Sequence, residues 1–507
     1  MALTWTEWIG IALALVATKL LYNHKGRQLP PGPKGWPIIG NLFDVPSKHP
    51  WFVYEEWGKK YGPIMSMNVL GQPIIVVNSH SIAKELMDRR GSKYSSRPQI
   101  PMINLMNFNK ANMALQPYGH EWRQTRRVAD YSLRPSAANN YRVMQKKNSH
   151  RYLRQLIEDP ANFYNHIRHF TTAVAMDIAY GYEIAESDDH YVILAETTVN
   201  KGTAAFYPAA FYVNMIPWLA RLPEWLPGMG FKKYARETSR FVQEMIEAPF
   251  AFVKEQMANG TATPSLTRDS LLECSDPEDE GRIKYVAASI YSAGADTTGS
   301  SLNTVLLSLA THPEVQKKAQ DELDRVIGRG RLPDYSDRDK LPYVDALFQE
   351  MMRWRIASPM GATRLTTEDD VYDNYFIPKG SIVQLNAWAM LHDPEHFPEP
   401  DAFKPERFLN KDGKCVEDPV LSAHFGFGRR VCPGRHLALN TIWITMTAIL
   451  HCFDVRRAKD ATGKEIDINT VYSDNLISFP YPFKCSITPR DQASIDMIKA
   501  TEKMEYI

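Results

Sequence analysis

The chain has 507 residues, of which 44% are hydrophobic and 23% charged, a composition that excludes wholesale disorder. Its formal net charge is only +1, and because phosphate binding needs a basic surplus we expect no nucleic-acid partner. Five cysteines with no C-x-x-C pair disfavour a disulfide framework, a zinc ribbon and a dithiol redox centre.

The chain begins with an apolar segment, residues 5–22, which as a helix would span about 27 Å, close to the hydrocarbon thickness of a bilayer. No Lys or Arg precedes Lys19, whereas several follow it, so the positive-inside rule places the N-terminus outside and the rest of the chain in the cytosol. A cleaved signal peptide is the alternative, but the basic residues that should precede its apolar stretch are missing. We therefore expect residues 1–24 to form a single-pass transmembrane anchor.

A proline cluster, Leu29–Pro33, comes next, and clustered prolines are stiff and extended. Residues 25–35 are therefore expected to be a proline-rich hinge between the anchor and the globule. Nothing between residues 36 and 490 resembles an inter-domain linker, so residues 36–507 are expected to form one domain.

Short elements open this domain. We expect a helix over Pro50–Tyr61, strands at Met65–Val69 and Ile74–Val77, and a helix over Ser81–Arg90 that stops at Gly91. Helical patterns then dominate to about residue 355, and strand-rich patches lie at residues 363–383 and 452–489. This order predicts a mainly α chain with small β-sheets (α+β), built as a single large helical domain.

Trp122 and Arg126 lie one helical turn apart in the sequence W-R-Q-T-R, so they share a helix face. The alternative is that the arginines of this segment lie on the surface and serve only solubility. A long helix is expected at about Ile283–Thr311, with small residues around its middle.

In that middle, the Thr297 hydroxyl can bond to the carbonyl of Ala293, four residues back, and loosen the helix. Asp296 stands beside it, and an acid next to an alcohol can pass protons. The plain alternative is helix packing, for which small residues are more often used.

Glu350 and Arg353 share a face of the helix expected over Tyr343–Trp354. Alone, such a pair is more often a solvated ion pair that contributes little to the stability of the fold. Arg407 follows in the sequence F-K-P-E-R-F.

The last motif, F-G-F-G-R-R-V-C-P-G at residues 425–434, is followed at once by a helical pattern. Cys432 therefore sits just before a helix N-terminus, where free N–H groups favour a thiolate. Gly428 and Gly434 let the backbone approach a flat ligand or the sulfur closely. The guanidinium of Arg430 can donate two hydrogen bonds to a carboxylate. Such a loop can hold a metal from one side. The alternative is a buried cysteine in a tight turn.

Residues 425–434 resemble the haem-binding signature of the cytochromes P-450, F-x-x-G-x-R-x-C-x-G, at every fixed position. The segments W-R-x-x-R, A-G-x-D-T-T, E-x-x-R and P-E-R-F resemble other motifs of that family, in its order. With the anchor and hinge, the chain looks most like the fungal microsomal branch. The resemblance implies the cytochrome P-450 fold and a haem-thiolate monooxygenase, an oxidoreductase, in the endoplasmic reticulum membrane.

The resemblance also implies roles for single residues. Cys432 would be the axial ligand of haem b, within a haem-binding loop that includes Phe425 and Gly434. The propionates would be bonded by Trp122, Arg126, Arg430 and, in a less regular motif, Arg364. Glu350, Arg353 and Arg407 would form a buried, structural ionic triad.

The implied reaction uses dioxygen and electrons from NADPH, delivered by NADPH–cytochrome P-450 reductase, with cytochrome b5 as a further donor. Asp296 and Thr297 would guide protons to dioxygen. Arg429, Arg435 and His436 also surround the thiolate loop, and those facing outwards are expected to dock the reductase. The acid–alcohol pair disfavours haem-thiolate isomerases and peroxide users.

By family position the substrate pocket is lined by five mostly apolar segments, which indicates a lipophilic terpenoid, steroid or aromatic substrate of secondary metabolism or xenobiotic oxidation. The segments are residues 100–108, 201–212, 293–298, 356–360 and 474–477. Two other functions stay open: a haem-based gas or redox sensor, and a membrane-tethered lipid-binding protein without haem. Neither accounts for the thiolate loop together with the acid–alcohol pair.

Overall fold

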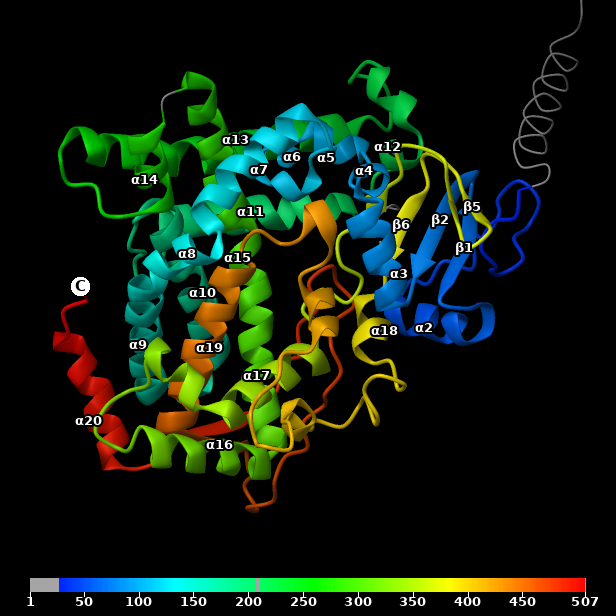
Figure 1. The fold of residues 1–507 in the computed structure, drawn as a ribbon. Helices are drawn as coiled ribbons and strands as arrows, with labels where there is room; N and C mark the ends of the chain where they lie inside the picture. The colour runs from blue at the N-terminus through cyan, green and yellow to red at the C-terminus, as the bar shows by residue number, and fades with distance from the viewer. Residues whose placement is uncertain (1–26, 207–209, 275, 507) are drawn as a thin grey trace, which may run out of the picture.

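The computed structural model describes residues 27–206, 210–274 and 276–506, and the expected anchor at residues 1–24 lies outside these ranges. Among the described residues, no helix combines the length and the apolar character needed to cross a bilayer. The architecture is mainly α-helical with small sheets, as the sequence predicts (Figure 1).

The α-helices are α2 Pro50–Tyr61, α3 His80–Lys84, α4 Gly91–Tyr94, α5 Pro101–Leu105, α6 Phe108–Ala111, α7 His120–Leu133, α8 Pro135–Ala138, α9 Arg142–Glu158, α10 Phe163–Tyr180, α11 His190–Thr203, α12 Tyr212–Met215, α13 Gly230–Ala258, α14 Leu266–Glu273, α15 Pro277–Thr311, α16 Pro313–Val326, α17 Pro342–Trp354, α18 Ala387–Leu391, α19 Arg435–Cys452 and α20 Gln492–Ala500. The strands are β1 Ile64–Val69, β2 Gln72–Val77, β3 Arg364–Leu365, β4 Asp370–Tyr372, β5 Tyr375–Ile377, β6 Ile382–Leu385, β7 Phe453–Arg457 and β8 Cys485–Pro489.

The largest sheet has the strand order β1-β2-β6-β3 and lies at one end of the molecule, with α2, α3 and α18 beside it (Figure 1). Strand β2 pairs antiparallel with β1 and parallel with β6, where Val77 faces Leu385. Strands β4 and β5 form a hairpin, and β7 pairs with β8. The strand-rich patches predicted from the sequence therefore contribute strands to three separate sheets.

The helical part is built around α15, which runs through its middle (Figure 1). Helices α10 and α19 pack against α15, and α9 packs against both of them. Helix α19 is buried along most of its length, as expected for a helix that is apolar on nearly every face. A single large apolar core joins these helices, and a second one lies under the main sheet.

Two predicted helix boundaries were wrong. The central helix begins at Pro277, because the Asp276 carboxylate accepts the N–H of Glu278 (2.9 Å) and proline suits the first helical position. The predicted stop at Gly91 is instead the start of α4. The helical path breaks one residue earlier, at Arg90 (φ −102°, ψ 18°), after a π-helical turn.

The described part of the proline-rich segment lies on the sheet. Ser66 donates its backbone N–H to the carbonyl of Pro31 (2.9 Å) and its hydroxyl to that of Pro30 (2.5 Å). The N–H of Phe376, in β5, bonds to the carbonyl of Gln28 (2.7 Å). From Gln28 onward the segment is therefore fixed to the domain.

Candidate functional site

The loop that carries Cys432 is closed by a hydrogen bond from the Cys432 N–H to the carbonyl of Phe425 (2.9 Å). Gly426 and Gly428 have φ values of +76° and +59°, a backbone conformation that favours glycine. A Cβ atom on Gly428 would also lie 2.1 Å from the carbonyl oxygen of Met87. The loop therefore needs glycine at both positions. Gly426 occupies a variable position of the motif, so its backbone requirement was missed from the sequence.

Cys432 lies three residues before α19, near the backbone N–H groups of Gly434 and Arg435. Burial raises the pKa of the Cys432 thiol, whereas the backbone N–H groups of Gly434 and Arg435 and the charges of Arg126 and Arg435 oppose that rise. A sulfur in this place can ligate a metal from one side as a thiolate. The described residues contain no cluster of three or more His, Cys, Asp or Glu side chains that could hold a metal ion by themselves.

Arginines from different parts of the chain converge on this loop. Arg126, on α7, donates to the carbonyl of Val431 (2.7 Å), and Arg364, on β3, donates to that of Phe427 (3.1 Å). Arg430 lies within the loop, and its guanidinium carbon is 4.0 Å from the ring centroid of Trp122. The structure therefore brings together Trp122 and all three arginines that the sequence resemblance assigned to a cofactor.

A fourth cation, Arg97, was missed, since a lone arginine in a loop carries no sequence signal. Its side chain donates to the carbonyls of Ala114 (2.8 Å), Ala362 and Thr363 (both 2.5 Å). Burial lowers the pKa of Arg97 to about 10. The carbonyl bonds hold the guanidinium in place without neutralising its charge.

Three of these cations, Arg97, Arg364 and Arg430, are buried, and no described carboxylate pairs with them. Burial lowers the pKa of Arg364 well below its ordinary value, and the charges of Arg97, Arg430 and Arg126 lower it further. The Arg364 Nε and Trp122 Nε1 atoms are buried and have no hydrogen-bond partner among the described residues. Buried cations with free donors need an anionic partner that has several oxygens.

The two propionates of a haem would be such a partner, and Cys432 could supply the thiolate for its iron. The residues present therefore fit the haem that the resemblance implies. Arg430 differs from the expectation in one respect. Its N–H groups donate to the carbonyls of Ser95 (2.8 Å), Gln116 (2.7 Å) and Met113 (3.5 Å), so it can supply charge near a propionate more readily than a free hydrogen bond.

The acid–alcohol pair lies midway along α15. The Thr297 hydroxyl donates to the carbonyl of Ala293 (3.0 Å), as expected. Asp296 and Ala293 both have accessible surface, although α15 is the central helix of the domain. Burial nevertheless raises the pKa of the Asp296 carboxyl. The Asp296 carboxyl is therefore partly desolvated, although its side chain keeps accessible surface.

Hydrogen bonds from neighbouring residues hold several of the segments that are expected to line a pocket. Ser300, on α15, donates to the carbonyl of Ser478 (2.5 Å), whose N–H donates to the carbonyl of Ala357 (2.8 Å). The Asn214 side chain accepts the N–H of Met102 (3.0 Å) and donates to the carbonyl of Ala205 (2.9 Å). These bonds connect parts of the chain that are far apart in sequence.

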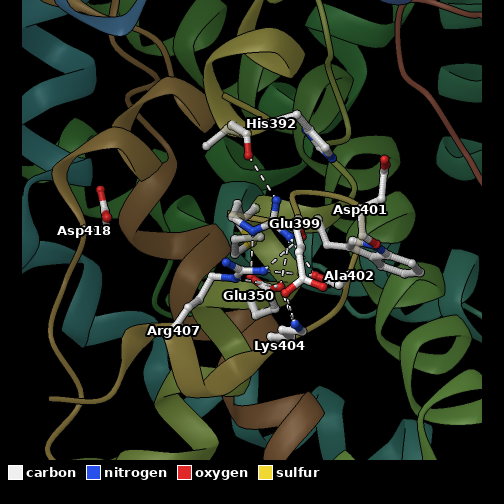
Figure 2. A network of polar contacts seen from close by, with 12 residues as sticks. Glu350, His392, Glu399, Asp401, Ala402, Lys404, Arg407 and Asp418 are labelled. Atoms are coloured by element: carbon white, nitrogen blue, oxygen red, sulfur yellow. Dashed lines mark hydrogen bonds and ion pairs between the residues drawn. The ribbon is translucent and has the colours of Figure 1, made fainter. Parts of the chain in front are cut away.

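The three residues of the expected ionic triad also meet, at the C-terminal end of α17, and Figure 2 shows Arg407 beside Glu350. Arg353 holds both oxygens of Glu350, with Nε at 2.6 Å and Nη2 at 2.9 Å, and Arg407 Nε lies 3.2 Å from Glu350 Oε1. The N–H of Lys404 also donates to Glu350 (2.7 Å), and Arg353 donates to the carbonyl of Leu391 (3.1 Å). This network ties α17 to residues 398–407.

A basic surface cavity of about 560 Å³ adjoins the thiolate loop. Arg123, Arg127 and Arg429 lie on its wall, together with Arg126 and a single acid, Asp130. Arg430, in contrast, is only 7% exposed and cannot face a partner protein. Of the two adjacent loop arginines, Arg429 is therefore the one that can reach a partner.

The chain has relatives over nearly its full length. The family model described as Cytochrome P450 matches residues 30–484. The chain is 40% identical to Cytochrome P450 monooxygenase 208 of Postia placenta over 97% of each chain. It is 39% identical to Cytochrome P450 monooxygenase COX2 of Coprinopsis cinerea over 97% of this chain and 94% of that one. Its identity to the Tryptamine 4-monooxygenase of Psilocybe cyanescens is 37%, over 96% and 98% of the two chains.

Proposed function

Because the chain belongs to the cytochrome P450 family of monooxygenases, whose members use haem iron, we propose that it inserts one atom of dioxygen into a lipophilic small molecule, with haem b as its cofactor. The observation that carries this proposal is the group of buried, unpaired arginines around the Cys432 loop. The reaction takes up one dioxygen, two electrons and two protons, and releases an oxygenated product and one water. The bound haem would supply the activation of dioxygen.

The thiolate loop would bind and orient the cofactor. Cys432 would ligate the iron through its sulfur, and the N–H groups of Gly434 and Arg435 would limit the charge on that sulfur. Trp122, Arg126, Arg364 and Arg97 would bond the propionates with their free donors, while Arg430 adds positive charge beside them. Phe425 would hold the loop in shape through its carbonyl, which accepts the Cys432 N–H.

Proton supply would fall to α15. Thr297 can present its hydroxyl to the reaction side, since the carbonyl of Ala293 orients it. Asp296 can hold a proton near neutral pH more readily than an exposed aspartate, because desolvation raises its pKa. The carboxyl would release that proton toward Thr297 and take a new one from solvent.

We infer a lipophilic substrate from the pocket segments, in which Phe206, Phe211 and Leu476 are apolar side chains that keep accessible surface. A terpenoid, a steroid or an aromatic compound would suit such a lining. The test is to screen these classes for shifts of the haem spectrum and for products formed with reductase and NADPH. A sensor would give spectral shifts without product, and a lipid-binding protein without haem would have no such spectrum.

Electrons would come from NADPH through NADPH–cytochrome P-450 reductase, with cytochrome b5 as a further donor. The basic cavity with Arg123, Arg127 and Arg429 supports this, because it lies beside the thiolate loop and suits an acidic partner. Arg123→Glu and Arg429→Glu should slow reduction in a salt-dependent way, whereas Lys499→Glu, on α20, should not. Equal reduction rates in all three variants would rule out this cavity as the docking surface for the reductase.

We also propose that residues 1–24 anchor the protein in the endoplasmic reticulum membrane, with the catalytic domain in the cytosol. Exposed apolar side chains support a membrane beside the domain: Trp225 is 80% exposed, Tyr212 73% and Trp218 58%. The test is extraction of membranes with alkaline carbonate, followed by protease digestion of intact microsomes. Release of the full-length protein by carbonate would rule out the anchor.

A further inference from the structure

A tyrosine on the wall of the basic cavity contacts two of the arginines that line it. The guanidinium carbons of Arg429 and Arg123 lie 5.5 Å and 5.8 Å from the ring centroid of Tyr118. Arg429 also donates a hydrogen bond from Nη1 to the Tyr118 hydroxyl. Because Arg123 belongs to α7 and Arg429 to the thiolate loop, Tyr118 joins the two parts of the chain that form the basic wall.

The two arginines that contact Tyr118 are also those whose charge is free. Among the residues that the structure describes, neither Arg123 nor Arg429 forms an ion pair, and both side chains are exposed. The other two arginines of the cavity, Arg126 and Arg127, each pair with an aspartate. An acidic partner can therefore bind Arg123 and Arg429 without displacing a carboxylate of this chain.

Tyr118 is itself held in place from the interior. Its ring packs against Trp122, with the ring centroids 5.4 Å apart, and Trp122 is buried. The backbone N–H of Tyr118 donates to the hydroxyl of Ser96, which is also buried (3.4 Å). A guanidinium that lies against an aromatic ring keeps its charge but loses freedom of movement. Tyr118 therefore gives two otherwise flexible surface arginines a fixed support.

Such a support affects how strongly a charged partner is held once it has arrived. Long-range attraction sets the rate of association, and it depends on the charges present and on salt. The ordering of flexible side chains at the interface weakens a complex, and differences of this kind are expressed mainly in the rate of dissociation. Because Tyr118 already orders Arg123 and Arg429 in the free protein, less order has to be imposed when the partner binds.

We propose that Tyr118 is a positioning residue for the redox partner, which holds Arg123 and Arg429 in the arrangement that binds acidic groups of the reductase and thereby slows dissociation of the complex. Tyr118 acts through the two arginines, and no covalent bond forms or breaks in this role. The inference rests on the proposed docking of the reductase at the basic cavity.

Two variants separate the ring of Tyr118 from its hydroxyl. Tyr118→Leu removes both, so both arginines lose their support, and the reductase should dissociate about tenfold faster. Tyr118→Phe removes only the hydrogen bond to Arg429, so dissociation should be about threefold faster. All charges remain in both variants, so the association rate and its dependence on salt should match those of the natural protein.

Stopped-flow binding of the reductase to full-length holoenzyme, at several salt concentrations, would measure both rate constants. Arg429→Gln is the reference for the loss of a charge and should slow association in a salt-dependent way. Tyr61→Leu is the matched control, because it removes a ring that lies 5.0 Å from the charge of Lys60 at the end of α2. It should change neither rate constant.

Faster dissociation in Tyr118→Leu, and to a lesser degree in Tyr118→Phe, with unchanged association would support the proposal. Unchanged dissociation in both variants would overturn it. A fall in association as large as that of Arg429→Gln would also overturn it, because Tyr118 would then act on charge and not on position. If Tyr118→Leu does not retain haem, Tyr118→Phe decides by the same criteria.

Failure of the proposed docking surface would look different from failure of this inference alone. If the reductase docks elsewhere, Arg429→Gln should bind it with the rate constants of the natural protein, and both proposals would be overturned. If only the role of Tyr118 is wrong, Arg429→Gln should still slow association, while Tyr118→Leu and Tyr118→Phe should dissociate as the natural protein does.

Discussion

The guanidinium of Arg353 lies against the carboxylate of Glu350, with Nε and Nη2 at 2.6 and 2.9 Å from its two oxygens, and both side chains are fully buried. Glu350→Gln would leave Arg353 charged, buried and without its partner. Such a loss costs about 3–5 kcal/mol, so we expect a corresponding fall in the free energy of unfolding, measured by urea titration.

The matched control is Glu224→Gln, which breaks the exposed Arg236–Glu224 pair. Its effect should stay within about 0.5–1 kcal/mol. If both substitutions cost the same, the buried triad does not stabilise the fold in the way its geometry implies.

The buried arginines predict opposite effects in the presence and absence of the cofactor. Arg364→Gln removes a cation that its neighbours repel, so the haem-free protein should unfold at a higher temperature. The same change removes a charge-assisted hydrogen bond of about 1.5–3 kcal/mol to a propionate, so haem should dissociate roughly 10- to 100-fold faster.

Calorimetry of the haem-free protein and haem transfer to an acceptor protein would measure the two effects. Arg456→Gln, which changes an arginine that is 61% exposed on β7, should alter neither quantity. A loss of stability in haem-free Arg364→Gln, with unchanged haem retention, would mean that Arg364 serves the fold alone.

Two glycines of the thiolate loop should respond differently to alanine. Gly428→Ala places a Cβ 2.1 Å from the Met87 carbonyl oxygen, at a φ of +59° whose strain alone costs about 1–3 kcal/mol. A Cβ on Gly434 meets no described atom within 4 Å, so Gly434→Ala should leave the haem-free fold within about 0.5 kcal/mol. Because Gly434 is expected to adjoin the haem, its variant should instead bind less haem, measured by porphyrin content. Equal losses of stability in both variants would contradict this division.

Asp296 gives a prediction about pH. Desolvation raises the pKa of its carboxyl, which means that the folded protein favours the neutral form. Ionisation of Asp296 therefore destabilises the fold at pH values above the ordinary carboxyl pKa, about 4, and has no effect well below it. Asp296→Asn should raise the melting temperature at neutral pH, and the gain should vanish in acid.

The control for this prediction is Asp321→Asn, in an exposed pair with Lys317 on α16. It should shift the melting temperature little at any pH. A lower melting temperature for Asp296→Asn at neutral pH would show instead that the fold stabilises the ionised carboxylate.

Local patterns in the sequence predicted much of the secondary structure, since helix periodicity and capping act over a few residues. The helix Pro50–Tyr61 was predicted at its observed bounds, and the helix expected from Tyr343 begins one residue earlier, at Pro342. The parallel pairing of β2 with β6 could not be predicted, because no local pattern connects Val77 with Leu385.

The residues of the candidate site likewise differ in whether a local sequence pattern predicts them. Cys432 and the acid–alcohol pair stand in motifs with fixed spacing, so the sequence alone predicts them as site residues. Arg97 has no motif, and only the fold shows that its guanidinium joins the other cations near the thiolate loop.

The carbon monoxide difference spectrum of the reduced protein tests most directly whether Cys432 ligates a haem. The natural protein should show the red-shifted band of a thiolate-ligated haem, Cys432→Ser should lose it, and Cys415→Ser, at a half-buried cysteine elsewhere, should retain it. Folded protein that contains no porphyrin, or a Cys432→Ser variant with the same band as the natural protein, would contradict the assignment of this chain as a haem-thiolate monooxygenase.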